Sequence, residues 1–171
     1  MFDPSALRER MVRHQVAARG VRNARVLDSM RQVPREAFVP DNLAEFAYDD
    51  SPLPIEEQQT ISQPYIVALM IEASGAGPAD RVLEIGTGSG YAAAVLSRVP
   101  REVYTVERHE ALATLATQRL RTLHYDNVEV LHGDGTLGWP EHAPYDAIIV
   151  AAGGPRIPTN CGTNWRSAAG W

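Results

Sequence analysis

The sequence predicts an α/β fold, a doubly wound parallel sheet preceded by a helical N-terminal region. From Arg81 onward, short apolar runs alternate with segments of helical periodicity. The runs are continuous, which is expected of parallel strands that helices cover on both faces. Alternating strands and helices are typical of βαβ units, whose strands share one parallel sheet. The expected strands are 81–85, 102–106, 128–132 and 147–150, and the expected helices between them are 91–98 and 109–123.

Two helices are expected at the start of the chain. The first spans residues 5–18, with Ser5 at the capping position and Gly20 ending it. The second spans residues 24–33 and is ended by Pro34, because proline cannot continue a helix. Apolar residues recur at helical spacing in both segments, so each helix is expected to bury one face.

A less regular stretch follows. Residues 38–48 are expected to hold a short helix, and residues 49–64 have little periodicity but contain three prolines, four acidic residues and three glutamines. An irregular segment of this length between ordered elements is usually functional, so we predict a working loop. A helix is expected over residues 65–74, directly after Pro64, whose missing N–H is tolerated at a helix start.

Composition excludes several classes of protein. The chain has 171 residues, enough for one domain with a core, and a formal net charge of −5 argues against nucleic acid as the main partner. A single cysteine, Cys161, excludes an intrachain disulfide and a C-x-x-C metal site. The first residues do not resemble a signal peptide, and no apolar run is long enough to span a bilayer. These features predict a cytoplasmic protein with no membrane partner.

The stretch 82–91 is the most informative part of the chain. A short apolar strand leads into Gly86-Thr87-Gly88-Ser89-Gly90, and a helix is expected to begin at Tyr91. Glycines let a backbone approach a ligand closely, and a helix N-terminus offers free N–H groups, so this corner is typical of nucleotide binding. The spacing G-x-G-x-G differs from the dinucleotide pattern G-x-G-x-x-G. The alternative is a tight turn without a ligand.

Two acidic residues stand where the next strands end. Glu107 follows Gly86 by 21 positions, where an acid in a doubly wound fold accepts hydrogen bonds from ribose hydroxyls; the alternative is a solvated charge. Asp134 lies between two glycines after the third strand and could accept from an exocyclic amine, although Asp and Gly also favour plain turns. The small residues 151–154 after the fourth strand indicate a close approach by a ligand or, alternatively, a dense turn.

Other polar residues give no independent signal. Ser62 has no neighbouring base in the sequence, so a nucleophilic serine is not supported, and it could simply cap the helix that follows. The five histidines show no metal-ligand spacing, so no metal site is predicted.

Six motifs follow one another in the order and spacing of a known family between about Met11 and Thr159: Val33–Pro40, Thr60–Tyr65, Leu83–Tyr91, Val106–Arg108, His132–Gly135 and Tyr145–Val150. Through them the chain resembles the protein-L-isoaspartate O-methyltransferases. Many methyltransferases share the glycine turn and the preceding Glu84, whereas the run Thr-Ile-Ser-Gln-Pro is the specific motif.

The resemblance implies a Rossmann-like methyltransferase fold and a repair enzyme. It implies transfer of a methyl group from S-adenosylmethionine to the α-carboxylate of L-isoaspartyl residues in damaged proteins or peptides. The implied active-site residue is Ser62, with Ile61, Gln63 and Pro64 beside the substrate. The implied cofactor contacts are Glu84, Gly86, Thr87, Gly88, Ser89, Gly90, Glu107, Asp134 and Gly135.

The chemistry that the resemblance implies needs little from the protein besides alignment. A carboxylate is already ionised at neutral pH, so methylation requires no general base. Two alternatives remain open: a methyltransferase that acts on another carboxylate or a small molecule, and an inactive fragment that binds the cofactor or a partner without turnover.

Two departures from the family pattern stand out. The family commonly has glycines in the loop before Gln-Thr-Ile-Ser, and residues 55–59 have none. After Thr159 the chain lacks the expected helix and further strands, and residues 160–171 show no periodicity. We hypothesise a one-base deletion near Thr159; the alternative is a natural short tail.

These observations predict how the chain is organised. Residues 1–78 form the helical region and substrate loop, residues 79–159 form the cofactor-binding core and residues 160–171 form an aberrant tail, all treated as one domain. With the C-terminal strands missing, strand 147–150 is expected to be an edge with unpaired backbone groups.

Overall fold

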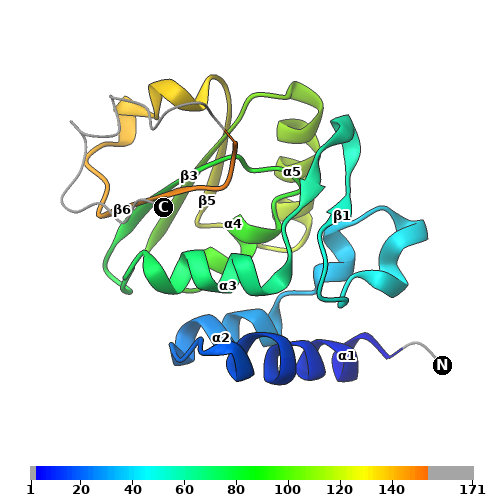
Figure 1. The fold of residues 1–171 in the computed structure, drawn as a ribbon. Helices are drawn as coiled ribbons and strands as arrows, with labels where there is room; N and C mark the ends of the chain where they lie inside the picture. The colour runs from blue at the N-terminus through cyan, green and yellow to red at the C-terminus, as the bar shows by residue number, and fades with distance from the viewer. Residues whose placement is uncertain (1–2, 154–171) are drawn as a thin grey trace.

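A computed structural model describes residues 3–153 and confirms the predicted α/β architecture. Its main sheet has four parallel strands in the order β5-β4-β3-β6 (Figure 1). Because the strand order reverses between β3 and β6, a ligand crevice is expected at the carboxyl ends of these two strands. The strands are β3 (Arg81–Ile85), β4 (Glu102–Glu107), β5 (Val128–His132) and β6 (Ala147–Val150).

The two faces of the sheet are covered differently. On one face the core contains side chains of α3 (Pro64–Ala73), α4 (Tyr91–Leu96) and α5 (Glu110–Thr122). On the other face a smaller cluster joins Leu83 and Tyr104 to Tyr145 and Trp139. In the described part of the chain, this second face is therefore covered by the segment between β5 and β6, with its 3₁₀ turns, and not by an α-helix as we had expected (Figure 1).

The N-terminal helical run differs in detail from the prediction. It begins as α1 (Pro4–Met11), continues through a π-helical turn and a 3₁₀ turn, and ends at Gly20, whose φ is +107°. The predicted cap, Ser5, is wrong. Asp3 caps the helix, because its carboxylate accepts hydrogen bonds from the backbone N–H groups of Ser5 (3.0 Å) and Ala6 (3.2 Å).

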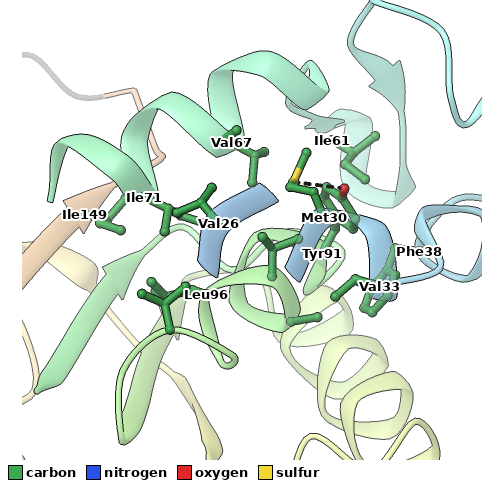
Figure 2. Packing of buried hydrophobic residues seen from close by; sticks show 14 of the residues in the cluster. Val26, Met30, Val33, Phe38, Ile61, Val67, Ile71, Tyr91, Leu96 and Ile149 are labelled. Carbon is green, nitrogen blue, oxygen red and sulfur yellow. Dashed lines mark hydrogen bonds between the residues drawn. The ribbon is translucent and has the colours of Figure 1, made fainter. Parts of the chain in front are cut away.

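The second predicted helix is confirmed as α2 (Ala24–Gln32), which Asn23 caps. Its apolar side chains Val26 and Met30 are fully buried among residues of α3 and α4 (Figure 2). The core therefore spans the proposed boundary at residue 78, which agrees with treating the chain as one domain; the division itself stays a prediction.

The irregular stretch 49–64 contains more structure than predicted. Strands β1 (Leu53–Pro54) and β2 (Thr60–Ile61) form a small antiparallel hairpin, which we call the substrate hairpin after the substrate loop that the family resemblance predicts here. Its tip is a 3₁₀ turn in which Glu57 and Gln58 have φ values of 57° and 55°. These left-handed conformations favour glycine, and the sequence offers none at the tip.

Replacing Gln58 by glycine is expected to stabilise the protein. Gln58→Gly removes the steric cost of a left-handed conformation and should raise the free energy of unfolding by about 1 kcal/mol. Chemical denaturation measures the change. Gln59→Gly is the matched control, because Gln59 has an extended backbone with φ −91°, where glycine should destabilise. Equal effects of the two substitutions would contradict the strain at position 58.

Only part of what was predicted for the end of the chain can be compared with the structure, because the described residues end at Gly153. Among the described strands, β6 lies at one edge of the sheet and pairs only with β3, as the edge prediction requires. The tail 160–171 and the junction at Thr159 lie outside the described residues, so the deletion hypothesis stays a prediction.

Candidate functional site

A small cavity of about 40 Å³ lies at the carboxyl end of β3, where the crevice was expected. The substrate hairpin forms one wall, and the turn after β3 forms the opposite wall. Small or apolar side chains from α3, α4 and the end of β6 close the remainder. The lining residues are Thr60, Ile61, Ser62, Val67, Gly86, Thr87, Gly88, Ser89, Tyr91, Ala92 and Ala151.

The glycine turn brings backbone very close to the neighbouring strand end. Gly86 has φ +97°, and a Cβ atom built on it would lie 3.0 Å from the Cβ of Ala152 and 3.1 Å from its backbone nitrogen. Gly90 does not line the cavity, and its predicted cofactor contact stays a prediction. It precedes α4 and packs against α5, where an added Cβ would lie 3.3 Å from that of Ala116.

Glu107 ties the end of β4 to the glycine turn. Its side chain is buried, so the alternative of a solvated charge is wrong. One carboxylate oxygen accepts from the backbone N–H of Gly88 at 2.9 Å, and the other accepts from that of His109 at 2.9 Å. Each oxygen has lone-pair capacity left for a further donor, so a contact with ribose hydroxyls stays a prediction that the geometry allows.

Glu84 lies beneath the glycine turn and not in the cavity wall. Its buried carboxylate accepts from the hydroxyl of Thr105 at 2.6 Å, and that hydroxyl lies 2.6 Å from the hydroxyl of Thr87 in the wall. Burial, with the nearby charge of Glu107 adding to it, raises the pKa of Glu84 to about 8, although the Thr105 hydrogen bond opposes the shift. A chain of hydrogen bonds thus connects Glu84 through Thr105 to Thr87 in the cavity wall. A direct contact between Glu84 and the cofactor stays a prediction.

The buried acid should make stability depend on pH. In the folded protein Glu84 keeps a proton up to about pH 8, whereas an unfolded chain releases it near the ordinary pKa of 4.5. The free energy of unfolding should therefore fall as pH rises between these values, because the folded state binds more protons. Glu84→Gln keeps an acceptor for Thr105 and should lose this dependence. Thermal unfolding across that pH range measures it, and parallel curves for the two proteins would refute the assignment.

Asp134 takes part in a turn at the end of β5. One of its oxygens accepts from the backbone N–H of Thr136 at 2.9 Å and from its hydroxyl at 2.8 Å, and these hydrogen bonds lower the pKa of the exposed carboxyl. Asp134 therefore forms a turn, which does not decide between the plain turn and the cofactor contact. Neither Asp134 nor Gly135 lines the cavity, and their cofactor contacts stay predictions.

Gly135 is required by packing. A Cβ atom built on it would lie only 2.5 Å from Cγ2 of Ile85, so the chain after β5 crosses close over the end of β3. This close approach accounts for the glycine without a ligand.

The proposed substrate residues separate into two groups. Ile61 and Ser62 lie in the cavity wall, whereas Gln63 and Pro64 do not. The side-chain amide of Gln63 instead donates to a carboxylate oxygen of Asp50 at 2.6 Å, and Pro64 starts α3. The residue at the cap position of α3 is Gln63, so the alternative that Ser62 caps this helix is wrong.

Sequence reasoning missed several residues at the site. The sequence predicts that Tyr91 begins a helix and ends the motif Leu83–Tyr91, with no role at the site, yet it lines the cavity. Arg35 lies within the motif Val33–Pro40, for which the sequence predicts no role at the site, yet its guanidinium donates to the carbonyl oxygen of Ser62 at 2.9 Å. Ala151 was indicated by the run of small residues after β6, and its place in the wall agrees with that hint.

Within residues 3–153 no cluster of three or more His, Cys, Asp and Glu side chains is arranged to hold a metal ion. No helix in this part of the chain combines the length and the apolar character needed to cross a membrane.

Comparison with known proteins decides the family. The family model for protein-L-isoaspartate(D-aspartate) O-methyltransferase matches residues 6–165. The chain belongs to this methyltransferase family. The resemblance noted in the sequence and the predicted Rossmann-like methyltransferase fold are thereby confirmed.

Curated relatives and solved structures agree with the family. Protein-L-isoaspartate O-methyltransferase 2 of Pelobacter propionicus is 65% identical over 151 residues, which cover 88% of this chain and 67% of the relative. Protein-L-isoaspartate O-methyltransferase 1 of Rhodopseudomonas palustris is 60% identical over 159 residues, which cover 93% of this chain and 65% of the relative.

Among solved structures, a protein-L-isoaspartate O-methyltransferase superposes with a TM-score of 0.83 at 34% identity, covering 93% of this chain and 52% of that chain. A second, the family member from Plasmodium falciparum in complex with S-adenosyl-L-homocysteine, superposes with a TM-score of 0.71 at 24% identity, covering 88% and 76%. The chain thus spans about half to three quarters of the length of these proteins.

Proposed function

We propose that this chain transfers a methyl group from S-adenosylmethionine to the α-carboxylate of L-isoaspartyl residues in damaged proteins. One observation carries the proposal: Ser62 of the family's specific motif and the glycine turn 86–89 line the same cavity. A donor held by the turn and an acceptor held by the hairpin would therefore meet across it. The enzyme class and the cofactor follow from the family.

The residues at the turn fit the cofactor. Gly86 and Gly88 present backbone without side chains, and Glu107 offers lone pairs for the two hydroxyls of a ribose. When bound, S-adenosylmethionine supplies a methyl group already activated by a sulfonium. The protein residues orient the two partners and exclude water, and such alignment can lower a barrier by roughly 7–11 kcal/mol.

The acceptor side needs a hydrogen-bond donor and no base. An isoaspartyl carboxylate is ionised at neutral pH and attacks as it is. The hydroxyl of Ser62 makes no hydrogen bond to another residue within 3–153 and can donate to one carboxylate oxygen. The same cavity wall also contains the apolar side chains of Ile61 and Val67 and the ring of Tyr91, which would limit the access of water to the reacting atoms.

Methylation of matched peptides tests the proposal. The protein should esterify a peptide with an L-isoaspartyl residue and leave the same peptide with normal aspartate unmodified; radiolabelled methyl groups report both rates. Equal rates would indicate another carboxylate substrate. Calorimetric binding of S-adenosylhomocysteine without methyl transfer would identify a binding fragment. Absence of binding and transfer would refute the proposal.

A further inference from the structure

Arg35 is a buried cation without a carboxylate partner. Its side chain has no solvent-exposed surface, burial lowers its pKa, and no acidic residue of the described chain is paired with it. The neighbouring Glu36 pairs instead with Arg8 at 3.2 Å. A buried charge without a counter-ion is costly even when carbonyl oxygens accept its hydrogen bonds, and a ligand that brings a negative charge nearby would offset part of that cost.

The guanidinium lies directly behind the cavity wall. One nitrogen donates to the carbonyl oxygen of Ala47 at 2.6 Å, and another donates to that of Ser62 at 2.9 Å. Its central carbon lies 4.7 Å from the ring centroid of Tyr91. Ser62 and Tyr91 both line the cavity, so the charge is separated from it by a single layer of residues.

The surroundings hold this arrangement rigidly. Tyr91 packs edge-on against Phe38, with ring centroids 5.7 Å apart, and its hydroxyl meets the sulfur of Met30 at 3.5 Å (Figure 2). The third guanidinium nitrogen of Arg35 is buried and has no partner among the described residues. The positive charge is thus neither neutralised nor screened by water within the part of the protein that the structure describes.

We propose that Arg35 is a positioning residue for the acceptor carboxylate, which fixes the backbone of Ser62 and places a positive charge behind the cavity that favours an anionic acceptor over a neutral one. This inference rests on the proposed function, because it assigns the acceptor to the wall that contains Ser62. It goes further by making the selection of a charged acceptor a property of a residue that does not touch the substrate.

Binding of two peptides that differ in one charge tests the inference. With S-adenosylhomocysteine present, the affinity for an L-isoaspartyl peptide is compared with that for its β-linked amide analogue, so no turnover is needed. Wild-type protein should favour the carboxylate by roughly tenfold, as expected for opposite charges separated by one layer of residues in a medium of low dielectric constant. Arg35→Met should abolish most of this preference and leave the cofactor affinity within about threefold.

Two further variants separate charge from structure. Arg35→Gln keeps a donor for the Ser62 carbonyl but no charge, and it should also lose the preference. Arg8→Met removes a paired arginine that anchors the same region through Tyr48 and Glu36, and it should lower thermal stability without changing the preference.

Each outcome decides the inference. A wild-type protein without preference for the carboxylate overturns it even if neither Arg35 variant folds. If Arg35→Met or Arg35→Gln folds and still prefers the carboxylate, Arg35 has only a structural role and the inference is wrong. Methyl transfer without charge preference would refute only the inference, whereas absence of peptide binding and of transfer would refute the proposed function as well.

Discussion

Ser62→Ala is expected to lower the rate of methyl transfer by roughly 10²-fold, the order of loss expected when a reacting carboxylate loses the hydrogen bond that orients it. Cofactor affinity should change little, because the cofactor contacts proposed above are made by the glycine turn and Glu107 and not by Ser62. The backbone at Ser62 should also keep its place, since Arg35 holds the carbonyl oxygen and not the side chain.

Initial rates with an isoaspartyl peptide and calorimetric binding of S-adenosylhomocysteine check this expectation. Ser51→Ala is the matched control, because Ser51 precedes the substrate hairpin and does not line the cavity. An equal loss of rate and of cofactor affinity in Ser62→Ala would show that this serine is structural.

Gly86→Ala should cause the largest loss of stability. The left-handed backbone of Gly86 alone makes a Cβ atom unfavourable by about 1–2 kcal/mol. The added atom would also lie within 3.2 Å of the backbone of Ala151 and Ala152, which cannot rotate away. Such overpacking typically adds about 1–3 kcal/mol, so the sum approaches the stability of many whole domains.

Gly20→Ala separates the two contributions. Gly20 has a similar φ of +107°, but a Cβ atom there meets nothing within 4 Å. Chemical denaturation of both variants should therefore show that Gly86→Ala costs clearly more than Gly20→Ala. Equal losses of stability would mean that the backbone at Ala151 and Ala152 shifts to accommodate the added Cβ atom, so that the close contact costs nothing.

The sheet could be predicted from the sequence because its signal is local. Strands 81–85, 128–132 and 147–150 were placed at their observed bounds, and the strand from 102 extends only one residue further. Continuous apolar runs mark buried parallel strands wherever they occur, and the spacing of glycines after Ile85 marks the turn.

Several side-chain roles at the site, in contrast, depend on contacts between residues far apart in sequence. Arg35 meets Ser62 across 27 positions, and Gln63 turns to Asp50 across 13, so neither role could be deduced from neighbouring residues. The predicted cap of the first helix was wrong for a different reason. Asp3 and Ser5 are both good capping residues, and only the position of Pro4 at the helix start decides between them.

The two walls of the cavity come from separate stretches of chain, with the substrate hairpin on one side and the turn after β3 on the other. In the proposed function, donor recognition and acceptor choice therefore belong to separate segments of the chain. A library of variants confined to residues 53–63 could therefore select for new carboxylate substrates, while the residues proposed to bind the cofactor, the glycine turn and Glu107, stay the same.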